Sequence, residues 1–245
     1  MSTSLSTSPC SGGTDETLPV FFDHSTWTAY AEVAVRMANL LTKLVIEGNN
    51  TLRGVSQRHL FDLVRTNVDS ESLVFGSAIA VEEYVYPDFR IICPYACKKN
   101  SKGKRTEGVV VAHDLSLNYD YLSNTTEWYH ELRVRNWTQA HVSKNHVVYN
   151  SACSYQRRSC ATQDGHWTRP YFDCGGGYIW MVTYSAPIFG WRSPTDRVPV
   201  FRGVGTIDIE LTNIDINQCE THPGHENSAT TYKSVDVFRG THTLQ

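Results

Sequence analysis

The chain has 245 residues, enough for one large domain or two small ones with a sizeable hydrophobic core. Its net charge of −3 and its pI of about 6.4 give no overall attraction to nucleic acid or anionic lipid, so neither is expected as a partner. No run of about 18 apolar residues occurs, so a membrane anchor is expected only in segments outside these 245 residues.

The first third of the chain indicates a tail followed by helices. Residues 1–22 are rich in Ser, Thr, Gly and Pro, which predicts a disordered N-terminal tail. A helix of more than twenty residues is predicted from an N-cap at Ser25, because apolar residues recur at helical spacing up to Glu47 and Gly48 is placed to end it. A second, shorter helix is predicted over residues 56–67.

The remainder of the chain predicts an antiparallel sheet. The strand patterns cover residues 73–84 and 89–96, which flank a hairpin turn at 86–88, and then 107–112, 178–186 and 204–211. A mixed helical stretch is predicted over 119–135. The expected fold is α+β: one domain over 23–215, with the long N-terminal helix packed on a central sheet of about five strands.

Two segments are expected to stand apart from this core. Residues 139–165 form a long polar insertion, which a disulfide between Cys153 and Cys160 is expected to hold together. Residues 216–245 form a polar C-terminal segment in which no second core is predicted.

Cysteines and glycosylation sequons indicate an oxidising compartment. Seven cysteines occur without a CxxC pair of the metal-binding type. Sequons begin at Asn49, Asn124 and Asn136, which are the expected glycosylation sites. Together these features favour the extracellular or lumenal side of a membrane protein.

Motifs of common enzymes and metal sites are missing from the sequence. No HExxH, GxSxG, Walker or GxGxxG pattern occurs. His222 and His225 are separated by Pro-Gly in a polar segment, so no metal site is predicted there. The glycines at 175–177 precede a strand, which predicts a hairpin turn and not a phosphate loop. No enzyme activity and no cofactor are therefore expected.

One enzymatic alternative remains open on the residues alone. A hydrolase could use His166 or His130 beside Asp173 as a general base. A His near an Asp is more often a hydrogen-bonded pair, and loss of turnover in His166→Ala would be needed to support the alternative.

A set of aromatic residues and one acid indicates a small-molecule pocket. Aromatic rings form pocket walls, and a carboxylate can hold an ammonium group. The alternative is that the rings are ordinary core and that the acid caps the turn before Gly175. The candidate ligand-binding residues are Tyr121, Trp128, Tyr129, Trp167, Tyr171, Asp173 and Tyr184.

Three sequence blocks resemble the Cache domain, the extracytoplasmic PAS-like sensor domain of transmembrane signalling proteins. Together they extend over about residues 25–215, with 139–165 unmatched. The blocks are VFGSAIAVE from Val74 with CPYA from Cys93; YDY from Tyr119 with EWY from Glu127; and WTRPYFDCGGG from Trp167 with TYSAP from Thr183 and GVGTID from Gly203.

The resemblance implies a ligand pocket beside the central sheet and a homodimer interface on the N-terminal helix. In the amino-acid-binding branch, a Tyr-x4-Arg-x-Trp-Tyr segment grips the carboxylate and a later Asp grips the amine. This chain carries Thr126 at the Arg position, and a hydroxyl cannot replace a bidentate guanidinium–carboxylate contact. An amine, a neutral small molecule or no ligand therefore remains open.

The expected function is that of an extracellular small-molecule-sensing domain of a transmembrane signal-transduction receptor. The alternative is a structural or protein-interaction ectodomain of the same fold, whose pocket is filled by its own side chains. An enclosed pocket around Trp128, Tyr129 and Asp173 distinguishes the two hypotheses.

Overall fold

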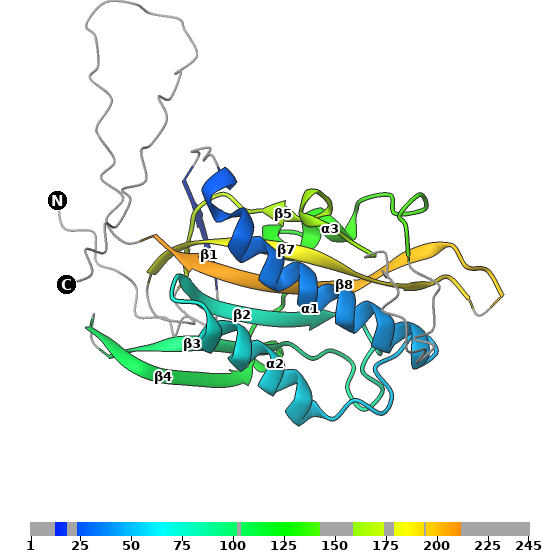
Figure 1. Cartoon of the computed structure of the whole chain (residues 1–245), viewed down its shortest axis with the longest axis horizontal. Coiled ribbons are helices and arrows are strands. Elements are labelled where there is room, and N and C mark those ends of the chain that lie inside the picture. Colours follow the sequence, from blue (N-terminus) through cyan, green and yellow to red (C-terminus); the bar gives the residue numbers. More distant parts are fainter. Residues whose placement is uncertain are drawn as a thin grey trace, which may run out of the picture.

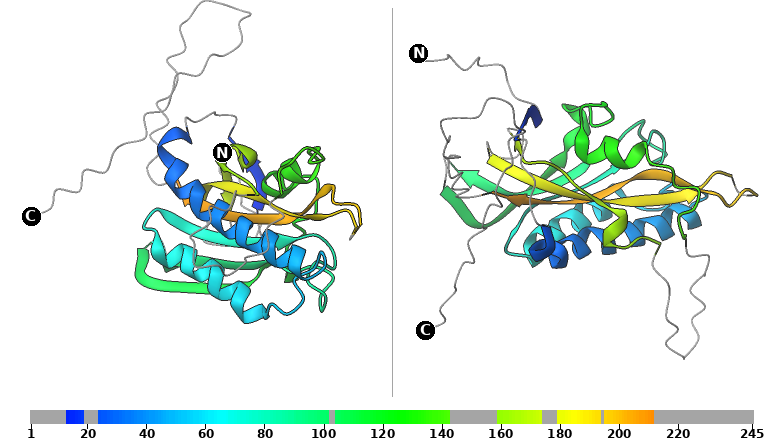
Figure 2. Two further views of the ribbon diagram at one scale, coloured as in Figure 1. Left: turned by 45° about the vertical axis from the view of Figure 1, so that its right-hand side comes forward. Right: turned by 90° about the horizontal axis from the view of Figure 1, so that it is seen from above.

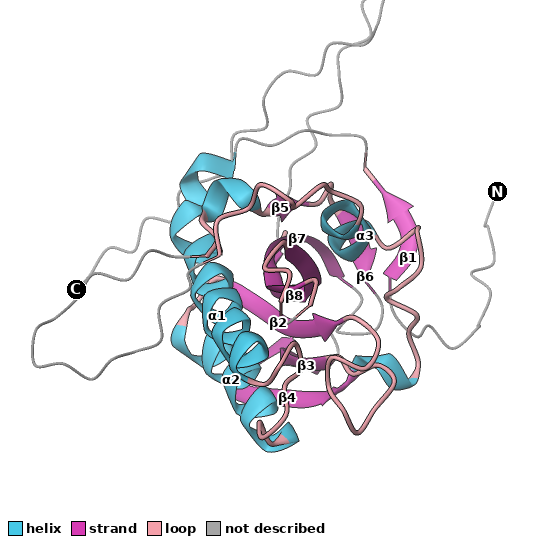
Figure 3. Ribbon diagram, turned by 90° about the vertical axis from the view of Figure 1, so that its right-hand side faces the viewer, coloured by secondary structure: helices cyan, strands magenta, loops and turns pink. Residues whose placement is uncertain are grey.

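The computed structural model describes residues 13–18, 24–101, 104–142, 159–173, 179–193 and 195–211. They form one antiparallel sheet whose two faces are covered by different helices (Figure 1). Helices α1 (Thr28–Glu47) and α2 (Gln57–Ser70) cover one face. The short helix α3 (Glu127–Arg133) lies on the other face (Figures 2 and 3).

The sheet has eight strands, and all recorded pairings are antiparallel. Each of the five longest strands overlaps a predicted one, which confirms the α+β class and the helix-on-sheet arrangement, although the strand predicted over 89–96 instead covers Pro94–Ser101. In spatial order the strands are β1 (Gly13–Thr17), β6 (Tyr171–Asp173), β7 (Ile179–Trp191), β8 (Pro199–Glu210), β2 (Val74–Val81), β3 (Pro94–Ser101) and β4 (Lys104–Asp114), with β5 (His166–Trp167) paired to β7.

Helix α1 forms because its apolar residues recur along one face and pack on the sheet. Ala34, Ala38, Leu41 and Val45 are fully buried, at spacings of three or four residues. Burying a side chain of the Leu or Val type contributes about 1.5–3 kcal/mol, so this face accounts for much of the attachment of α1. The helix ends at Gly48, as predicted, and the Gly48 amide donates to the Leu44 carbonyl.

The start of α1 differs from the prediction. A 3₁₀ turn, His24–Trp27, precedes the helix, and the N-cap is Trp27 without a capping side-chain hydrogen bond. The predicted cap, Ser25, lies inside this turn, where its carbonyl accepts from the Thr28 hydroxyl at 2.9 Å. Burial of the Trp27 ring therefore sets the helix start in place of a polar cap.

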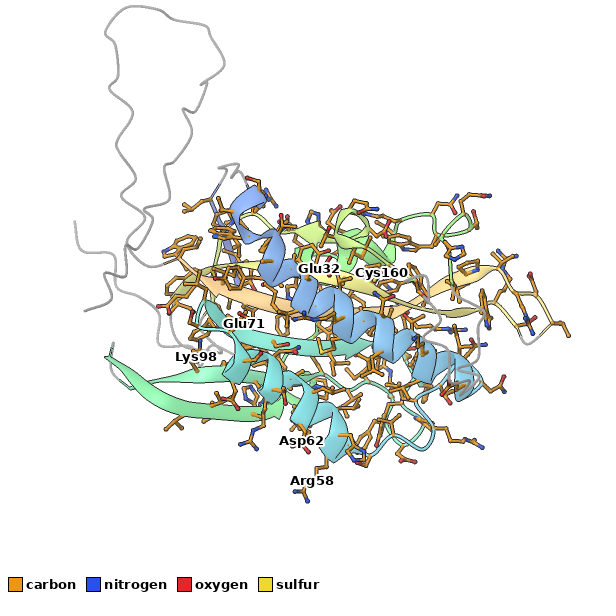
Figure 4. The ribbon with its side chains drawn as sticks, in the orientation of Figure 1. Glu32, Arg58, Asp62, Glu71, Lys98 and Cys160 are labelled. Atoms are coloured by element: carbon orange, nitrogen blue, oxygen red, sulfur yellow. The ribbon has the colours of Figure 1, made fainter. Side chains whose placement is uncertain are left out.

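Helix α2 is capped at both ends by side chains. The Ser56 hydroxyl accepts from the His59 amide at 3.3 Å, which is the N-cap bond expected of a serine. At the other end, Lys98 Nζ of β3 donates to the carbonyls of Glu71 and Ser72 at 3.0 and 2.7 Å, and Figure 4 shows Lys98 beside Glu71. These bonds attach the end of α2 to the sheet.

Alternation along β8 places different chemistry on the two faces of the sheet. Ile207 and Ile209 pack in the cluster under α1 and α2. Thr206 and Asp208 point to the opposite face, on which the 3₁₀ turn Leu115–Leu117 and α3 lie. This opposite face is the one that carries the candidate site.

One prediction about the peripheral segments does not agree with the structure. Residues 13–17, expected in a disordered tail, form β1 and pair with β6. Cys160 is buried, and Cys153, its expected disulfide partner, lies outside the described residues, so that pairing stays a prediction. Asn39 of α1 explains the position of Cys160, because its side-chain amide donates to the Cys160 carbonyl and its oxygen accepts from the Cys160 amide. The segment is thus attached to α1 by hydrogen bonds.

Several expectations fall on residues outside the described ranges: most of the 139–165 insertion, the glycines at 175–177, and the segment 216–245. The strands on either side of 174–178 do pair antiparallel, with Asp173 opposite Ile179. Within the described ranges no helix is both long and apolar enough to cross a membrane.

Candidate functional site

A small cavity lies on the α3 side of the sheet, over its central strands. Its volume is about 30 Å³, which is room for about two water molecules or a very small organic cation. The five central strands of the sheet supply the floor, and the segment 115–128 supplies the cover. The lining residues are Ala78, Tyr95, Leu115, Tyr119, Trp128, Tyr171, Asp173, Met181, Thr183, Thr206 and Asp208.

The floor of the cavity carries a chain of hydrogen bonds across three neighbouring strands. The Thr183 hydroxyl of β7 donates to Asp208 Oδ1 of β8 at 2.7 Å. The Tyr171 hydroxyl of β6 lies 2.7 Å from the same Thr183 oxygen. Since the Thr183 proton is directed to the carboxylate, Tyr171 is the donor in the second bond. The Asp208 carboxylate is thereby held in a fixed orientation.

Gly76 has no side chain, which lets the second carboxylate oxygen of Asp208 approach the Tyr95 hydroxyl. A Cβ on Gly76 of β2 would lie 2.5 Å from Asp208 Oδ2 and 2.6 Å from the Tyr95 hydroxyl, so both oxygens occupy the space that a side chain would fill. The Tyr95 hydroxyl counteracts the rise in the pKa of Asp208, yet no described atom meets hydrogen-bond geometry with it. Tyr95 is therefore a buried donor and acceptor with unused capacity, facing the cavity.

Asp208 is the titratable group with the clearest functional character. The pKa of Asp208 is raised from 3.8 to about 7, chiefly by burial and also by the nearby Asp173 carboxylate, while the Thr183 hydrogen bond and the nearby Tyr95 hydroxyl lower it. Asp208 and Asp173 are only 4% and 8% exposed. Among the described residues that line the cavity, none is Lys, Arg or His. The site is thus an anionic pocket in aromatic surroundings.

Trp128 and Tyr119 cover the cavity. Their rings stack with centroids 6.4 Å apart at an interplanar angle of 23°. The Tyr119 hydroxyl lies 3.2 Å from the hydroxyl of Thr126, which is buried. Thr126 stands where the amino-acid-binding Cache pattern has Arg, and here it bonds to a covering residue without lining the cavity.

Tyr121 and Tyr129, two of the predicted ligand-binding residues, lie behind Trp128 and not in the cavity lining. Tyr121 stacks on Trp128 and donates from its hydroxyl to the Val81 carbonyl at 2.6 Å. The Tyr129 hydroxyl donates to Glu82 Oε1 at 2.8 Å. Both tyrosines therefore pack behind Trp128 and hold it over the cavity through hydrogen bonds to residues at the end of β2.

Trp167 and Tyr184, also predicted for the pocket, lie on the opposite face of the sheet. Their ring centroids are 5.1 Å apart, and both pack in the cluster beneath α1. The structure thus brings Trp128, Tyr171 and Asp173 together in the cavity, with Tyr121 and Tyr129 behind, and separates Trp167 and Tyr184 from them.

The sequence analysis missed eight of the eleven lining residues, among them the polar Tyr95, Thr183, Thr206 and Asp208. A signal for two of them was present, since Thr206 and Asp208 alternate with Gly205, Ile207 and Ile209. Alternation identifies a polar face but not its partner. The pairing of Asp208 with Thr183 follows from the β7–β8 register, in which the two residues are opposite.

The histidines proposed for an enzymatic alternative are placed elsewhere. His166 Nε2 lies 3.2 Å from Glu127 Oε1, and neither His166 nor His130 lines the cavity with Asp173. Glu127 also accepts from the backbone amide of Arg169 at 3.1 Å and from its Nε at 3.0 Å. This carboxylate connects the start of α3 to the segment between β5 and β6.

Replacing Glu127 by Ala is expected to loosen the cover of the cavity and to destabilise the domain by about 1–2 kcal/mol, because three hydrogen bonds to a charged group are lost. Burial alone would raise the pKa of Glu127, but bonds from His166 and Arg169 hold it below its usual value. The contribution is therefore present at neutral pH and lost as pH falls through that lowered pKa. Urea unfolding measures it, with the exposed Glu131→Ala on the same helix as control; equal losses in both variants would contradict the connection.

The three sequon asparagines, Asn49, Asn124 and Asn136, are exposed. Each could carry a glycan without disturbing the core, and their modification stays a prediction.

A comparison with protein families matches residues 166–245 to the GPR158/179 extracellular domain. The metabotropic glycine receptor of Bos taurus is 35% identical over 144 residues, which cover 51% of this chain and 12% of the receptor. The G-protein coupled receptor 179 of Mus musculus is 40% identical over 58 residues, or 22% of this chain and 2% of that protein. The chain thus spans a small part of these relatives.

One solved structure that resembles this chain is described as the extracellular domain of a histidine kinase. The two structures have a TM-score of 0.47 and 21% sequence identity, and the match covers 76% of this chain and 56% of that chain. The helix-on-sheet architecture described above agrees with the expected Cache-like fold. The family match over residues 166–245 agrees with the expected extracellular location and with a receptor ectodomain.

Proposed function

We propose that this domain senses a small primary amine outside the cell and belongs to a transmembrane signal-transduction receptor. The observation that carries the proposal is the cavity with two buried carboxylates, Asp173 and Asp208, and no basic side chain among its described lining residues. A buried negative charge is costly unless a positive charge compensates it. A cationic ligand supplies that charge.

The size and walls of the cavity support an ammonium group as the recognised part. A volume of about 30 Å³ suits a head group of about two heavy atoms. Trp128 and Tyr119 present aromatic rings, which attract cations over their faces. We infer that Asp173 and Asp208 bind the ammonium and that the rings exclude water.

An amino acid fits this cavity less well than an amine. The name of the relatives, metabotropic glycine receptor, associates those proteins with glycine, which carries a carboxylate beside its ammonium. Here the described lining offers no Arg or Lys for that carboxylate, and Thr126 occupies the place of the family's Arg. A carboxylate placed near two acidic side chains is repelled. Glycine is therefore the informative comparison ligand.

The direct test is a thermal-shift experiment on the full chain with methylammonium, ethanolamine and glycine. An amine at about 100 times its dissociation constant stabilises the fold by about 2.7 kcal/mol, a readily measured shift. Amines are expected to stabilise the chain more than glycine does. Stabilisation by glycine alone would overturn the choice of ligand class, and no stabilisation by any of them would favour a protein-interaction ectodomain.

Replacing Asp173 by Asn is expected to weaken amine binding about thirtyfold, because the loss of one charged hydrogen-bond acceptor costs about 2 kcal/mol. The fold is expected to persist, since the amide has the shape of the carboxylate. The matched control is Asp69→Asn, an exposed residue of α2 on the other side of the sheet. Titration calorimetry with methylammonium measures both; an unchanged affinity in Asp173→Asn would remove Asp173 from the site.

The interaction alternative is favoured by one observation. Tyr121 and Tyr129, expected to line a pocket, are packed in the core, so the cavity is smaller than the pocket that the sequence suggests. Dimerisation through α1 stays a proposal, and its contact would have to use the few exposed positions of that helix, such as Arg36 and Leu40. A non-enzymatic role is likewise part of the proposal.

A further inference from the structure

The cavity combines two buried acids in a way that suggests a second property. Resting on the proposed amine function, we propose that this domain exchanges a proton for its ligand. The empty cavity holds one proton on the Asp173–Asp208 pair, and an incoming ammonium group replaces it. The O–H bond of the carboxylic acid breaks, the proton passes to solvent, and the ammonium N–H groups then bond to the resulting carboxylates.

The position of Asp208 supports storage of a proton. Its carboxyl group is 4% exposed and lies between β2 and β7 on the covered face of the sheet. One oxygen already accepts the Thr183 hydroxyl at 2.7 Å. The other faces Tyr95 across the space above Gly76 and is open to a proton or a ligand donor. Protonation at this oxygen leaves the Thr183 bond intact.

The groups that face Asp208 do not neutralise it. β3 presents Tyr95 and Cys97, Cys93 directly precedes this strand, and β6 presents Tyr171 and Asp173. β2 and β7 contribute Gly76, Ala78, Met181 and Thr183, none of which titrates, and the cover contributes Leu115, Tyr119 and Trp128. Beyond these, His113 of β4 packs against the Tyr95 ring and Asp114 accepts from the Cys93 amide.

Two carboxylates that share a buried site do not both ionise near neutral pH unless a cation joins them. The described surroundings are neutral or acidic, and burial together with Asp173 raises the pKa of Asp208 to about 7. One proton on the pair is therefore the stable state of the ligand-free cavity below about pH 7. The protonation state of the site therefore changes within the physiological pH range.

The unused Tyr95 hydroxyl indicates what replaces the proton. It is buried and has no partner among the described atoms. An ammonium group has three N–H donors and no acceptor. Asp208 Oδ2 and the Tyr95 oxygen lie on either side of the space above Gly76, so one ammonium group there can donate to both. The ligand thus satisfies a polar atom that protonation leaves without a partner.

The test is titration calorimetry of methylammonium chloride into the full chain, in two buffers of different ionisation enthalpy and at several pH values. The dissociation constant is expected to fall about tenfold between about pH 6 and pH 8, with about half a proton released at pH 7. The Asp208→Asn variant is expected to bind without proton release. In Asp173→Asn, loss of the neighbouring charge should move the proton release to lower pH.

The outcomes separate this inference from the proposed function. Binding of methylammonium with equal affinity at all pH values and no proton release would overturn the exchange and leave the amine site standing. No binding at about pH 8, where the pair is ionised, would overturn the amine site and the exchange with it. Proton release that persists in Asp208→Asn would overturn the assignment to this pair.

Discussion

Replacing Asp208 by Asn is expected to stabilise the ligand-free domain above neutral pH, although it removes a hydrogen-bonded buried residue. The pKa of Asp208 rises from 3.8 in the unfolded chain to about 7 in the folded one. The folded state thus binds a proton that the unfolded state has lost, and the free energy of unfolding falls as pH rises from about 4 to about 7. Three pKa units correspond to about 4 kcal/mol.

The variant lacks this decline because Asn does not titrate. Its amide oxygen can still accept from Thr183, which keeps the hydrogen-bond chain at 2.7 Å. Urea unfolding at about pH 5 and pH 8 should therefore show a stability loss in the native sequence and a nearly flat profile in Asp208→Asn. Asp88→Asn, at an exposed loop position, is the control and should follow the native profile. A variant less stable than the native sequence at pH 8 would contradict the raised pKa of the buried Asp208.

Substituting Ala for Gly76 is expected to eliminate amine binding and to destabilise the domain by about 1–3 kcal/mol. The added Cβ would lie 2.5 Å from Asp208 Oδ2, 2.6 Å from the Tyr95 hydroxyl and 3.0 Å from Tyr95 Cε2. Neither neighbour can move freely, since Asp208 is bonded to Thr183 and Tyr95 packs beside His113. The methyl group therefore occupies the space in which the ligand ammonium is proposed to meet both oxygens.

Gly205→Ala is the matched control for this substitution. Gly205 lies in the adjacent strand, and its Cβ would approach Met37 Cε at 2.9 Å on the opposite face of the sheet. The end of a methionine side chain is flexible and can give way. Gly205→Ala should bind methylammonium like the native sequence in calorimetry. If Gly76→Ala binds equally well, the oxygens above Gly76 do not form the ligand site.

The long elements of the fold were predictable because their patterns are local. The apolar spacing from Ala31 to Val45 gave α1, and the alternation of 204–211 gave β8. Strand β1 was not predictable in this way: GTDET contains no apolar residue, and its conformation comes from backbone pairing with β6. A strand that depends on its neighbour leaves no periodic signal in its own sequence.

The site was only partly predictable for a related reason. Adjacent residues of a strand face opposite sides, so Thr183 lines the cavity while Tyr184 packs under α1. Aromatic character alone selected Tyr184 and Trp167, and the face was decided by the sheet register. Asp208 belongs to the site because β7 and β8 place it opposite Thr183, a contact between residues 25 positions apart.

Strand β8 contributes residues to both faces of the sheet, the cavity face and the face covered by α1. Thr206 and Asp208, which line the cavity, alternate with Gly205 and Ile207, which lie against α1 and its cluster. Because protein interiors are densely packed, we expect a shift of β8 at the cavity to alter the packing of α1 on the sheet. An occupied cavity would then act on a long helix on the other face through a single strand, with no intervening loop or hinge.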